Sequence, residues 1–283
     1  MFNKKLKDEA LSIHERTKER YNKSYNDMSN SCEKLYSVRE NAVDIIEYIE
    51  EIVNSISNTP KKFDAELIKV KRELDRFHET EEYAKEAYEA SVKEGIHIAS
   101  GVTAGVGVAT MAPTALMGIA TTFGTASTGT AISALSGAAA QKAATAWIGR
   151  TFVGFAVKEG AGMAAGQAFL ALAGPIGWGL TAVTTGASLI KLANENRKIA
   201  DDAVREAKDI SVAREALNEA KAKIESIKRK TNKLFKDLIN QKSDIEQFRN
   251  ADYKSLDDDE KLILGCLVNN TLSLGRLLNE TIE

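Results

Sequence analysis

The residues that most often carry out enzymatic chemistry are few and widely separated in this chain. The three histidines, His14, His78 and His97, fall in three different segments and lack the spacing of a metal site. The chain contains no Gly-x-x-x-x-Gly-Lys-Ser/Thr phosphate loop and no Gly-x-Ser-x-Gly nucleophile elbow. We therefore expect no catalytic centre, no cofactor and no bound metal, and we expect that the protein is not an enzyme.

Two further sequence features have a chemical interpretation. Gly160 to Gly166 superficially shows the spacing of a dinucleotide-binding loop, but no strand pattern precedes it, and it lies in a region almost without charge. We therefore do not favour nucleotide binding. Cys32 and Cys266 are too few for a disulfide scaffold. We expect each to be a buried free thiol, although they could pair if the first and last helices lie side by side.

The charge pattern divides the chain into two charged arms and a central segment. Residues 95–190, here called the apolar block, hold only four of the 78 Lys, Arg, Asp and Glu residues of the chain: Lys142, Arg150, Lys158 and Glu159. The apolar block is rich in Gly, Ala, Ser and Thr rather than in Leu and Ile. Small residues let helices approach closely but anchor a helix weakly in lipid. This composition indicates a segment that enters a membrane conditionally.

Parts of the apolar block are long enough to span a bilayer, which takes about 20 residues. Residues 95–141 carry no formal charge and could form a hairpin of two spans. Residues 166–190 are the best single span, with a Gly-Pro-Ile-Gly centre that would kink it or make it a re-entrant hairpin. Gly101 and Gly105, like Gly162 and Gly166, have the Gly-x-x-x-Gly spacing of paired membrane helices. The candidate residues for insertion and helix pairing are Gly101, Gly105, Gly162, Gly166, Gly174, Pro175, Gly177 and Trp178.

Residues 142–159 form an amphipathic interval within the apolar block. Aromatic and basic side chains alternate there, which suits a helix lying at a membrane interface. The candidate interfacial residues are Trp147, Arg150, Phe152 and Phe155. A surface helix in water with a few aromatic residues in the core is the alternative.

The arms show apolar residues spaced three and four apart, the pattern of helices that bury one stripe against a partner. These stripes cover residues 21–56, 63–88, 199–248 and 264–278. Asn58-Thr59-Pro60 predicts a short connection and hence an antiparallel hairpin of the first two helices. Five polar residues interrupt the stripes: Arg39, Glu81, Glu206, Thr231 and Gln241.

The stripes predict an all-α fold, an elongated antiparallel helical bundle with a central apolar, Gly/Ala-rich helical head or hairpin. A helix from about residue 190 to 250 would be roughly 90 Å long. Ser255, followed by three aspartates, predicts the capped start of a last helix. The expected domains are an N-terminal hairpin of the stalk (1–94), the membrane-active head (95–190), and a long helix plus a final helix that complete the stalk (191–283).

This arrangement resembles that of the α-helical pore-forming toxins of the cytolysin A and haemolytic enterotoxin group. The resemblance rests on charged helical arms that flank one apolar segment, without a signal peptide at the start. It implies that the bundle is a soluble tail, that the apolar head is folded against it, and that contact with a membrane releases the head to form an oligomeric pore. The apolar block is longer and richer in Gly than the usual insert of that group. In this respect it is similar to the glycine-zipper segments of bacterial membrane-permeabilising effectors.

The expected partners are therefore a lipid bilayer and further copies of the chain, which would form a homo-oligomer on insertion. A formal net charge of −2 gives no reason to expect nucleic acid. The N-terminus lacks the apolar core of a secretory signal, so we expect synthesis in the cytoplasm, membrane association on activation, and any export by a non-classical route. Two alternatives remain: a membrane-anchored or cytoplasmic coiled-coil scaffold that binds a protein partner along its stalk, and a bundle whose head never leaves water.

Overall fold

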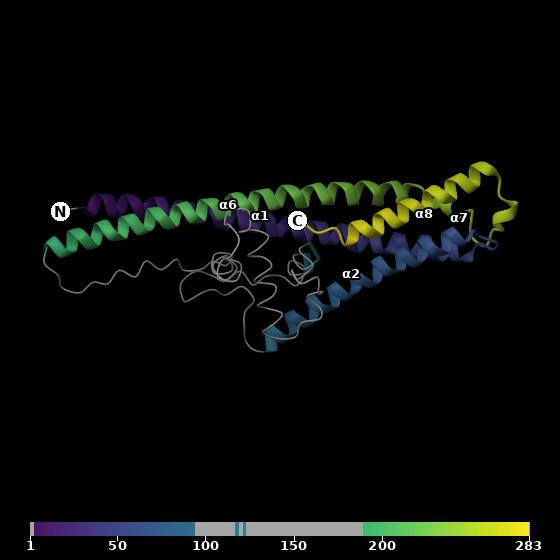
Figure 1. Ribbon diagram of the computed structural model, residues 1–283, viewed down its shortest axis with the longest axis horizontal. Coiled ribbons are helices and arrows are strands. Elements are labelled where there is room, and N and C mark those ends of the chain that lie inside the picture. Colours follow the sequence, from purple (N-terminus) through teal and green to yellow (C-terminus); the bar gives the residue numbers. More distant parts are fainter. Residues whose placement is uncertain (1–2, 94–116, 119–120, 123–188, 283) are drawn as a thin grey trace. The chain divides into compact units, whose positions relative to one another are not determined.

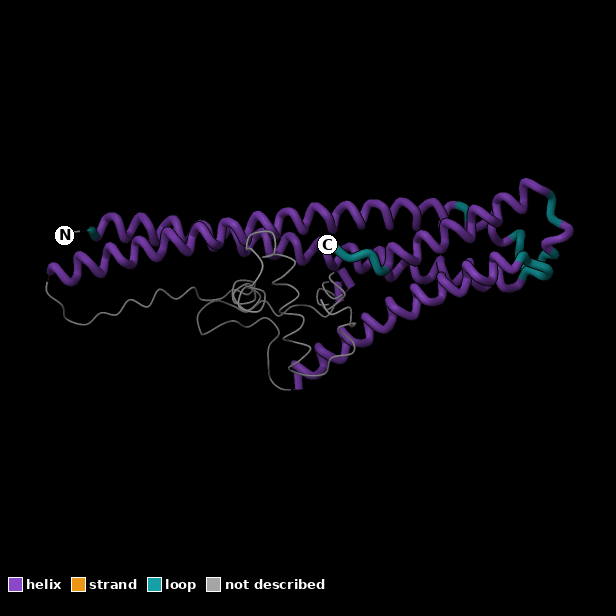
Figure 2. The backbone as a smooth tube through the Cα atoms, in the orientation of Figure 1, coloured by secondary structure: helices purple, strands orange, loops and turns teal. Residues whose placement is uncertain are grey.

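A computed structural model describes residues 3–93, 117–118, 121–122 and 189–282 (Figure 1). Its elements are α1 (Lys4–Ser55), α2 (Lys61–Lys93), α6 (Leu189–Asn240), α7 (Lys242–Glu246), the 3₁₀ helix η2 (Tyr253–Ser255) and α8 (Asp258–Leu278). Within these residues there is no β-strand, and the prediction of an all-α helical bundle is confirmed (Figure 2). None of the described helices combines the length and the apolarity that a bilayer crossing needs.

The chain divides into two compact units, and α1 and α6 each contribute to both. Of the described residues, unit 1 comprises 3–28, 91–93 and 189–221, and unit 2 comprises 29–90, 117–118, 121–122 and 222–282. In unit 1, α1 and α6 run parallel. The ion pairs His14–Glu206 and Asp27–Lys221 show this, because the two pairs have almost the same separation in sequence, 192 and 194 residues.

The core of unit 2 is built from the predicted stripes. Buried Ile, Leu, Val and Phe side chains of α1 and α2 meet those of α8 and of the end of α6 in one cluster. α1 and α2 are antiparallel, as the short connection predicts, since Tyr36 near the middle of α1 contacts Phe77 and Glu81 of α2. The α1–α2 connection and the α7–α8 connection lie at the same end of unit 2 (Figure 2). There the Ser57 amide donates to the Ala251 carbonyl, and the Ser57 carbonyl accepts from the Tyr253 amide.

The predicted continuous helix from 190 to 250 is wrong at its C-terminal end. α6 ends at Asn240, and after Gln241 the chain forms the short α7. Ile245 and Phe248 are buried, and Asn250 adopts a left-handed φ of 58°. The backbone leaves the helical conformation at Gln241 (φ −88°, ψ 0°), and the chain then turns toward α8 with both side chains buried.

The predicted cap of the last helix is also corrected. Ser255 ends η2, and the N-cap of α8 is Asp257. The Asp257 carboxylate accepts from the Glu260 amide at 2.8 Å, and the Glu260 side chain accepts from the Asp257 amide at 2.9 Å. This reciprocal pair satisfies two amides that a helix start leaves without partners.

Candidate site that holds the apolar block to the bundle

Arg39, one of the five polar interruptions of the stripes, is fully buried in unit 2. Its guanidinium donates three hydrogen bonds, and all three go to backbone carbonyls. Nε donates to Leu277 at 3.1 Å, Nη1 to Thr121 at 2.8 Å and Nη2 to Glu280 at 2.5 Å. Arg39 of α1 therefore joins the C-terminal end of α8 to a residue of the apolar block.

The acceptors explain how a buried guanidinium is tolerated here. The last four carbonyls of a helix have no partner within the helix and form the negative end of its dipole. The Leu277 carbonyl is one of these, because α8 ends at Leu278. Burial lowers the pKa of Arg39 to about 10, and the nearby Glu280 carboxylate opposes that shift. Arg39 is therefore still charged at neutral pH.

Besides the first two residues of α6, four residues of the apolar block are described, and these four contact this site. Met117, Gly118, Thr121 and Thr122 are helical. The hydroxyls of Thr121 and Thr122 donate to the Met117 and Gly118 carbonyls at 2.9 and 2.6 Å. The Thr122 carbonyl accepts from the Ile282 amide at 3.3 Å. Both threonines are buried, so their backbone carbonyls are satisfied by Arg39 and Ile282 instead of water.

Gly118 allows this part of the apolar block to touch α1 backbone to backbone. A Cβ atom added at Gly118 would lie 2.7 Å from the carbonyl carbon of Cys32, closer than real contacts allow. The Cys32 thiol is fully buried, and the Thr122 hydroxyl lies close to it. Burial raises the pKa of Cys32 to about 12, and the nearby Thr122 hydroxyl and Arg39 charge only partly oppose this shift. A thiol in this environment is not a nucleophile at neutral pH.

A second polar group ties α2 to the same region. The Tyr36 hydroxyl lies 2.9 Å from a carboxylate oxygen of Glu81 and 3.3 Å from the sulfur of Met117. The other Glu81 oxygen lies 3.0 Å from His78 Nδ1. Burial raises the pKa of Tyr36, and the hydrogen bond to Glu81 adds to the shift, so Tyr36 stays neutral. We call Cys32, Tyr36, Arg39, Glu81 and their contacts in the apolar block the Arg39 site.

The other polar or reactive side chains singled out from the sequence make structural contacts or are exposed. Thr231 is buried and donates to the Ile227 carbonyl at 2.9 Å, and Gln241 lies at the bend after α6. In unit 1, His14 is 4% exposed and lies 3.1 Å from Glu206. Cys32 and Cys266 are both free, and Cys266 is exposed, so the expectation that it is buried is wrong. Among the described residues, no group of three or more His, Cys, Asp and Glu could hold a metal ion.

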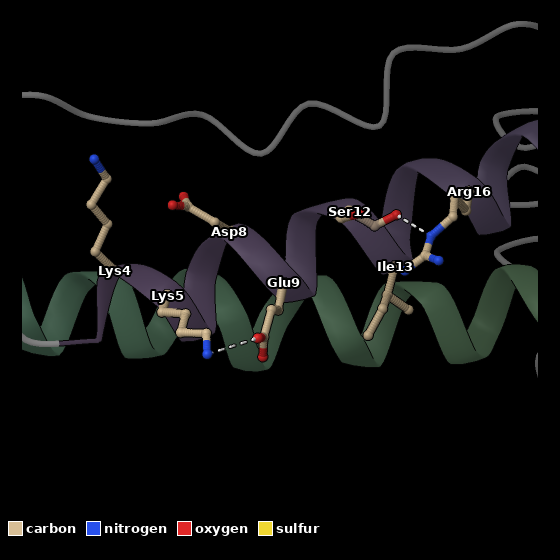
Figure 3. A pocket seen from close by; sticks show the side chains of 7 residues that line it. All are labelled: Lys4, Lys5, Asp8, Glu9, Ser12, Ile13 and Arg16. Carbon is tan, nitrogen blue, oxygen red and sulfur yellow. Dashed lines mark hydrogen bonds and ion pairs between the residues drawn. The ribbon is translucent and has the colours of Figure 1, made fainter.

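A surface hollow in the described part of the chain is lined by side chains of a single helix. It lies along the first turns of α1 (Figure 3). Lys5 pairs with Glu9 at 3.9 Å, and Arg16 donates to the Ser12 carbonyl at 3.2 Å. The side chains that line it all come from α1: Lys4, Lys5, Asp8, Glu9, Ser12, Ile13 and Arg16. Lys5, Glu9 and Arg16 therefore make contacts within their own helix on an exposed face.

The residues predicted from the sequence to insert, to pair or to lie at an interface are outside the described residues. These are Gly101, Gly105, Gly162, Gly166, Gly174, Pro175, Gly177 and Trp178, with Trp147, Arg150, Phe152 and Phe155. The Arg39 site was missed from the sequence, although its signal was present. Arg39 interrupts an otherwise apolar stripe, and a charge at such a position requires buried acceptors.

Comparisons of the chain with protein-family models, with curated proteins and with solved structures found no match. The features that bear on function are therefore the Arg39 site and the composition of the apolar block. In the Arg39 site the Cys32 thiol and the Tyr36 phenol have raised pKa values, so both keep their protons at neutral pH, and the Arg39 guanidinium keeps its charge. The chemistry of this site is that of holding backbone groups in place.

Proposed function

We propose that this protein is membrane-active. Its helical bundle holds part of the apolar block in the resting form, and contact with a bilayer releases the block for insertion. Pairing of glycine faces, at Gly101 and Gly105 and at Gly162 and Gly166, then assembles copies of the chain and permeabilises the membrane.

The observation that carries this proposal is the hydrogen bond from the buried Arg39 to the Thr121 carbonyl. A segment with so little charge would ordinarily be held by large apolar side chains. Here, Met117 packs against the core of unit 2, but Gly118, Thr121 and Thr122 attach through backbone groups and small side chains. Hydrogen bonds of this kind contribute roughly 1 kcal/mol each, and about 1.5–3 kcal/mol when one partner is charged. Such an attachment is specific, but a competing lipid surface can outweigh it.

A disulfide that locks the Arg39 site tests release directly. Thr122→Cys would place a second thiol beside Cys32, because the Thr122 hydroxyl already contacts that thiol. The change is made together with Cys266→Ser, which removes the exposed thiol. Thr121→Cys in the same background is the matched control, since the Thr121 hydroxyl contacts the Met117 and Gly118 carbonyls of its own turn, whereas the Thr122 hydroxyl also lies beside Cys32.

We expect the parent chain to release a trapped dye from lipid vesicles. The oxidised Thr122→Cys variant should not leak, and a reductant should restore leakage. Leakage by the oxidised, fully bridged protein would contradict release of this segment. Binding to vesicles without leakage from any variant would instead support the membrane-anchored scaffold. A chain that neither binds nor leaks would contradict the membrane role altogether.

The native thiols give an independent reading of the same step. In water at pH 8, Cys266 should be alkylated rapidly and Cys32 hardly at all, because Cys32 is buried and its pKa is raised to about 12. On addition of vesicles, Cys32 should become reactive as Gly118 and Thr122 leave. Mass spectrometry of the two cysteine peptides measures both rates. Equal protection of Cys32 with and without lipid would argue against release.

A further inference from the structure

α8 carries two stripes of heptad spacing on opposite faces. The buried stripe belongs to the core of unit 2 and consists of Leu264, Leu267, Thr271, Leu274 and Leu278. The second stripe is exposed and consists of Asp259, Leu262, Cys266, Asn269, Ser273 and Arg276, spaced three, four, three, four and three. Leu262 precedes Leu264 by two positions, which is about 200° around a helix. The exposed stripe therefore points away from the core.

The exposed stripe has an unusual character for this chain. Leu262 is 66% exposed, and the neighbouring Ile263 is 46% exposed. A Cβ atom added at Gly265, next to Cys266, would meet nothing within 4 Å. Between its two ends the stripe has no charged residue, although the arms around it are highly charged. It is thus an uncharged, partly apolar helix face with room for another helix.

The two ends of the stripe carry opposite charges. Asp259 stands in the first turn of α8 and Arg276 in the last. Neither forms an ion pair with another residue in the described part of the chain. The distribution is symmetric about the middle of the stripe, because Asp259 and Arg276 lie equally far from its centre, as do Leu262 and Ser273, and Cys266 and Asn269.

We propose that this stripe binds the same stripe of a second copy of the chain, with the two α8 helices antiparallel. In that arrangement Asp259 faces the Arg276 position of the other copy at both ends, and Cys266 faces the Asn269 position in the middle. A parallel pairing would instead set like charges against each other. A two-fold pairing is also the usual symmetry of a homodimer.

The size of the surface sets the expected strength. The stripe covers 18 residues, or about 27 Å of helix, so the interface is small and the dimer should be weak. We expect a dissociation constant in the micromolar range that rises with salt, because exposed charges at the ends contribute. This dimer forms without lipid and does not depend on the proposed membrane activity.

Charge exchange between the two ends is the first test. Sedimentation velocity of the full-length chain at several concentrations should show a monomer–dimer equilibrium. Asp259→Arg or Arg276→Asp alone should weaken it about tenfold or more, and the two changes together should restore it, since the opposite charges then face each other again. Asp258→Arg is the control, because Asp258 is an exposed acidic residue of the same turn outside the stripe.

The outcomes are distinguishable from association through the apolar block. A chain that is monomeric at all concentrations would overturn the proposal. So would self-association that both single variants leave unchanged, or a double variant that stays as weak as the single ones. Circular dichroism checks that each variant keeps the helical content of the parent.

A cross-link tests the antiparallel register without changing any charge. Asn269→Cys should form a disulfide with Cys266 of the other copy under mild oxidation, and peptide mapping should identify the 266–269 linkage. Asn269→Cys combined with Cys266→Ser is the control and should cross-link poorly. Linkages of 266 to 266 and of 269 to 269 as the main products would indicate a parallel pair and would overturn the proposed register.

Discussion

Unit 1 and unit 2 bury different kinds of side chain where α1 meets its neighbours. In unit 1, one contact cluster of α1 and α6 is made of alanine: Ala10, Ala200 and Ala203. His14 and Tyr21 are also buried in this unit. In unit 2, the contacts are made by large apolar side chains such as Ile49, Phe77 and Leu267. Unit 1 also buries Ile210 and Leu217, so its helix contact mixes alanine with larger apolar side chains.

This difference bears on where the molecule can open. Burying apolar surface stabilises the folded state by roughly 25 cal/mol per Å². The alanine contacts of unit 1 therefore contribute less than the isoleucine and leucine contacts of unit 2. α6 begins at Leu189, at the C-terminal end of the apolar block, and its first 33 residues belong to unit 1. We expect the weaker unit to open locally at lower free energy than unit 2.

A matched pair of core truncations should give the largest effect. Ile49 in unit 2 and Ile210 in unit 1 are both fully buried. Ile49→Ala should lower the free energy of unfolding by about 4 kcal/mol, because a well-packed core cannot collapse onto the cavity. Ile210→Ala should cost only about 2 kcal/mol, because a looser unit relaxes around the missing atoms. Denaturant unfolding measures both, and equal losses would remove the distinction between the units.

Replacing the buried guanidinium should give the next largest effect. Arg39→Met keeps much of the side-chain volume but leaves the Thr121, Leu277 and Glu280 carbonyls without their donor. We expect a loss of about 3 kcal/mol. Hydrogen exchange should increase at the amide of Ile282, whose acceptor Thr122 belongs to the same site.

The control for this variant is Arg76→Met on α2. The Arg76 side chain is 56% exposed and pairs with Glu73 at 3.5 Å. An exposed pair contributes little, so the change should stay within about 0.5 kcal/mol. If Arg39→Met is as mild as Arg76→Met, the Arg39 site does not hold the apolar block.

The helices of both units could be predicted from the sequence, but the Arg39 site could not. Heptad spacing depends on neighbouring residues, so the stripes and the stop at Pro60 were visible along the chain. The bend after Asn240 has no local breaker, since it arises from the burial of Ile245 and Phe248. The partners of Arg39 come from positions 121, 277 and 280, which only the folded chain brings together. The position of Arg39 in an apolar stripe predicts that buried hydrogen-bond acceptors exist, but not which residues supply them.

The next prediction contrasts two glycines of unit 2. Gly118→Ala forces a Cβ atom against the backbone of Cys32 and should destabilise the protein by about 2 kcal/mol. Gly265→Ala meets open space in the middle of α8 and should stabilise it by about 0.5–1 kcal/mol, because alanine favours helix. Thermal and denaturant unfolding should therefore show shifts of opposite sign. A Gly118→Ala variant as stable as the parent would contradict the close approach of the apolar block to α1.

The smallest effects should come from removing one hydroxyl in each unit. The Tyr21 hydroxyl in unit 1 is buried and has no hydrogen-bond partner among the described residues, whereas the Tyr36 hydroxyl in unit 2 bonds to Glu81 at 2.9 Å. Tyr21→Phe should raise the free energy of unfolding by about 0.5 kcal/mol, since a buried group without a partner is removed. Tyr36→Phe should lower it by about 1 kcal/mol, since the Glu81 carboxylate loses a donor.

Local hydrogen exchange can assign these two small changes to their units. The gain from Tyr21→Phe should be seen in amides of α1 before Met28, and the loss from Tyr36→Phe in amides of unit 2. A decrease in stability for Tyr21→Phe would mean that its hydroxyl is bonded in solution. The Tyr21 hydroxyl would then not weaken unit 1. The lower stability that we expect for unit 1 would have to come from its small alanine side chains alone.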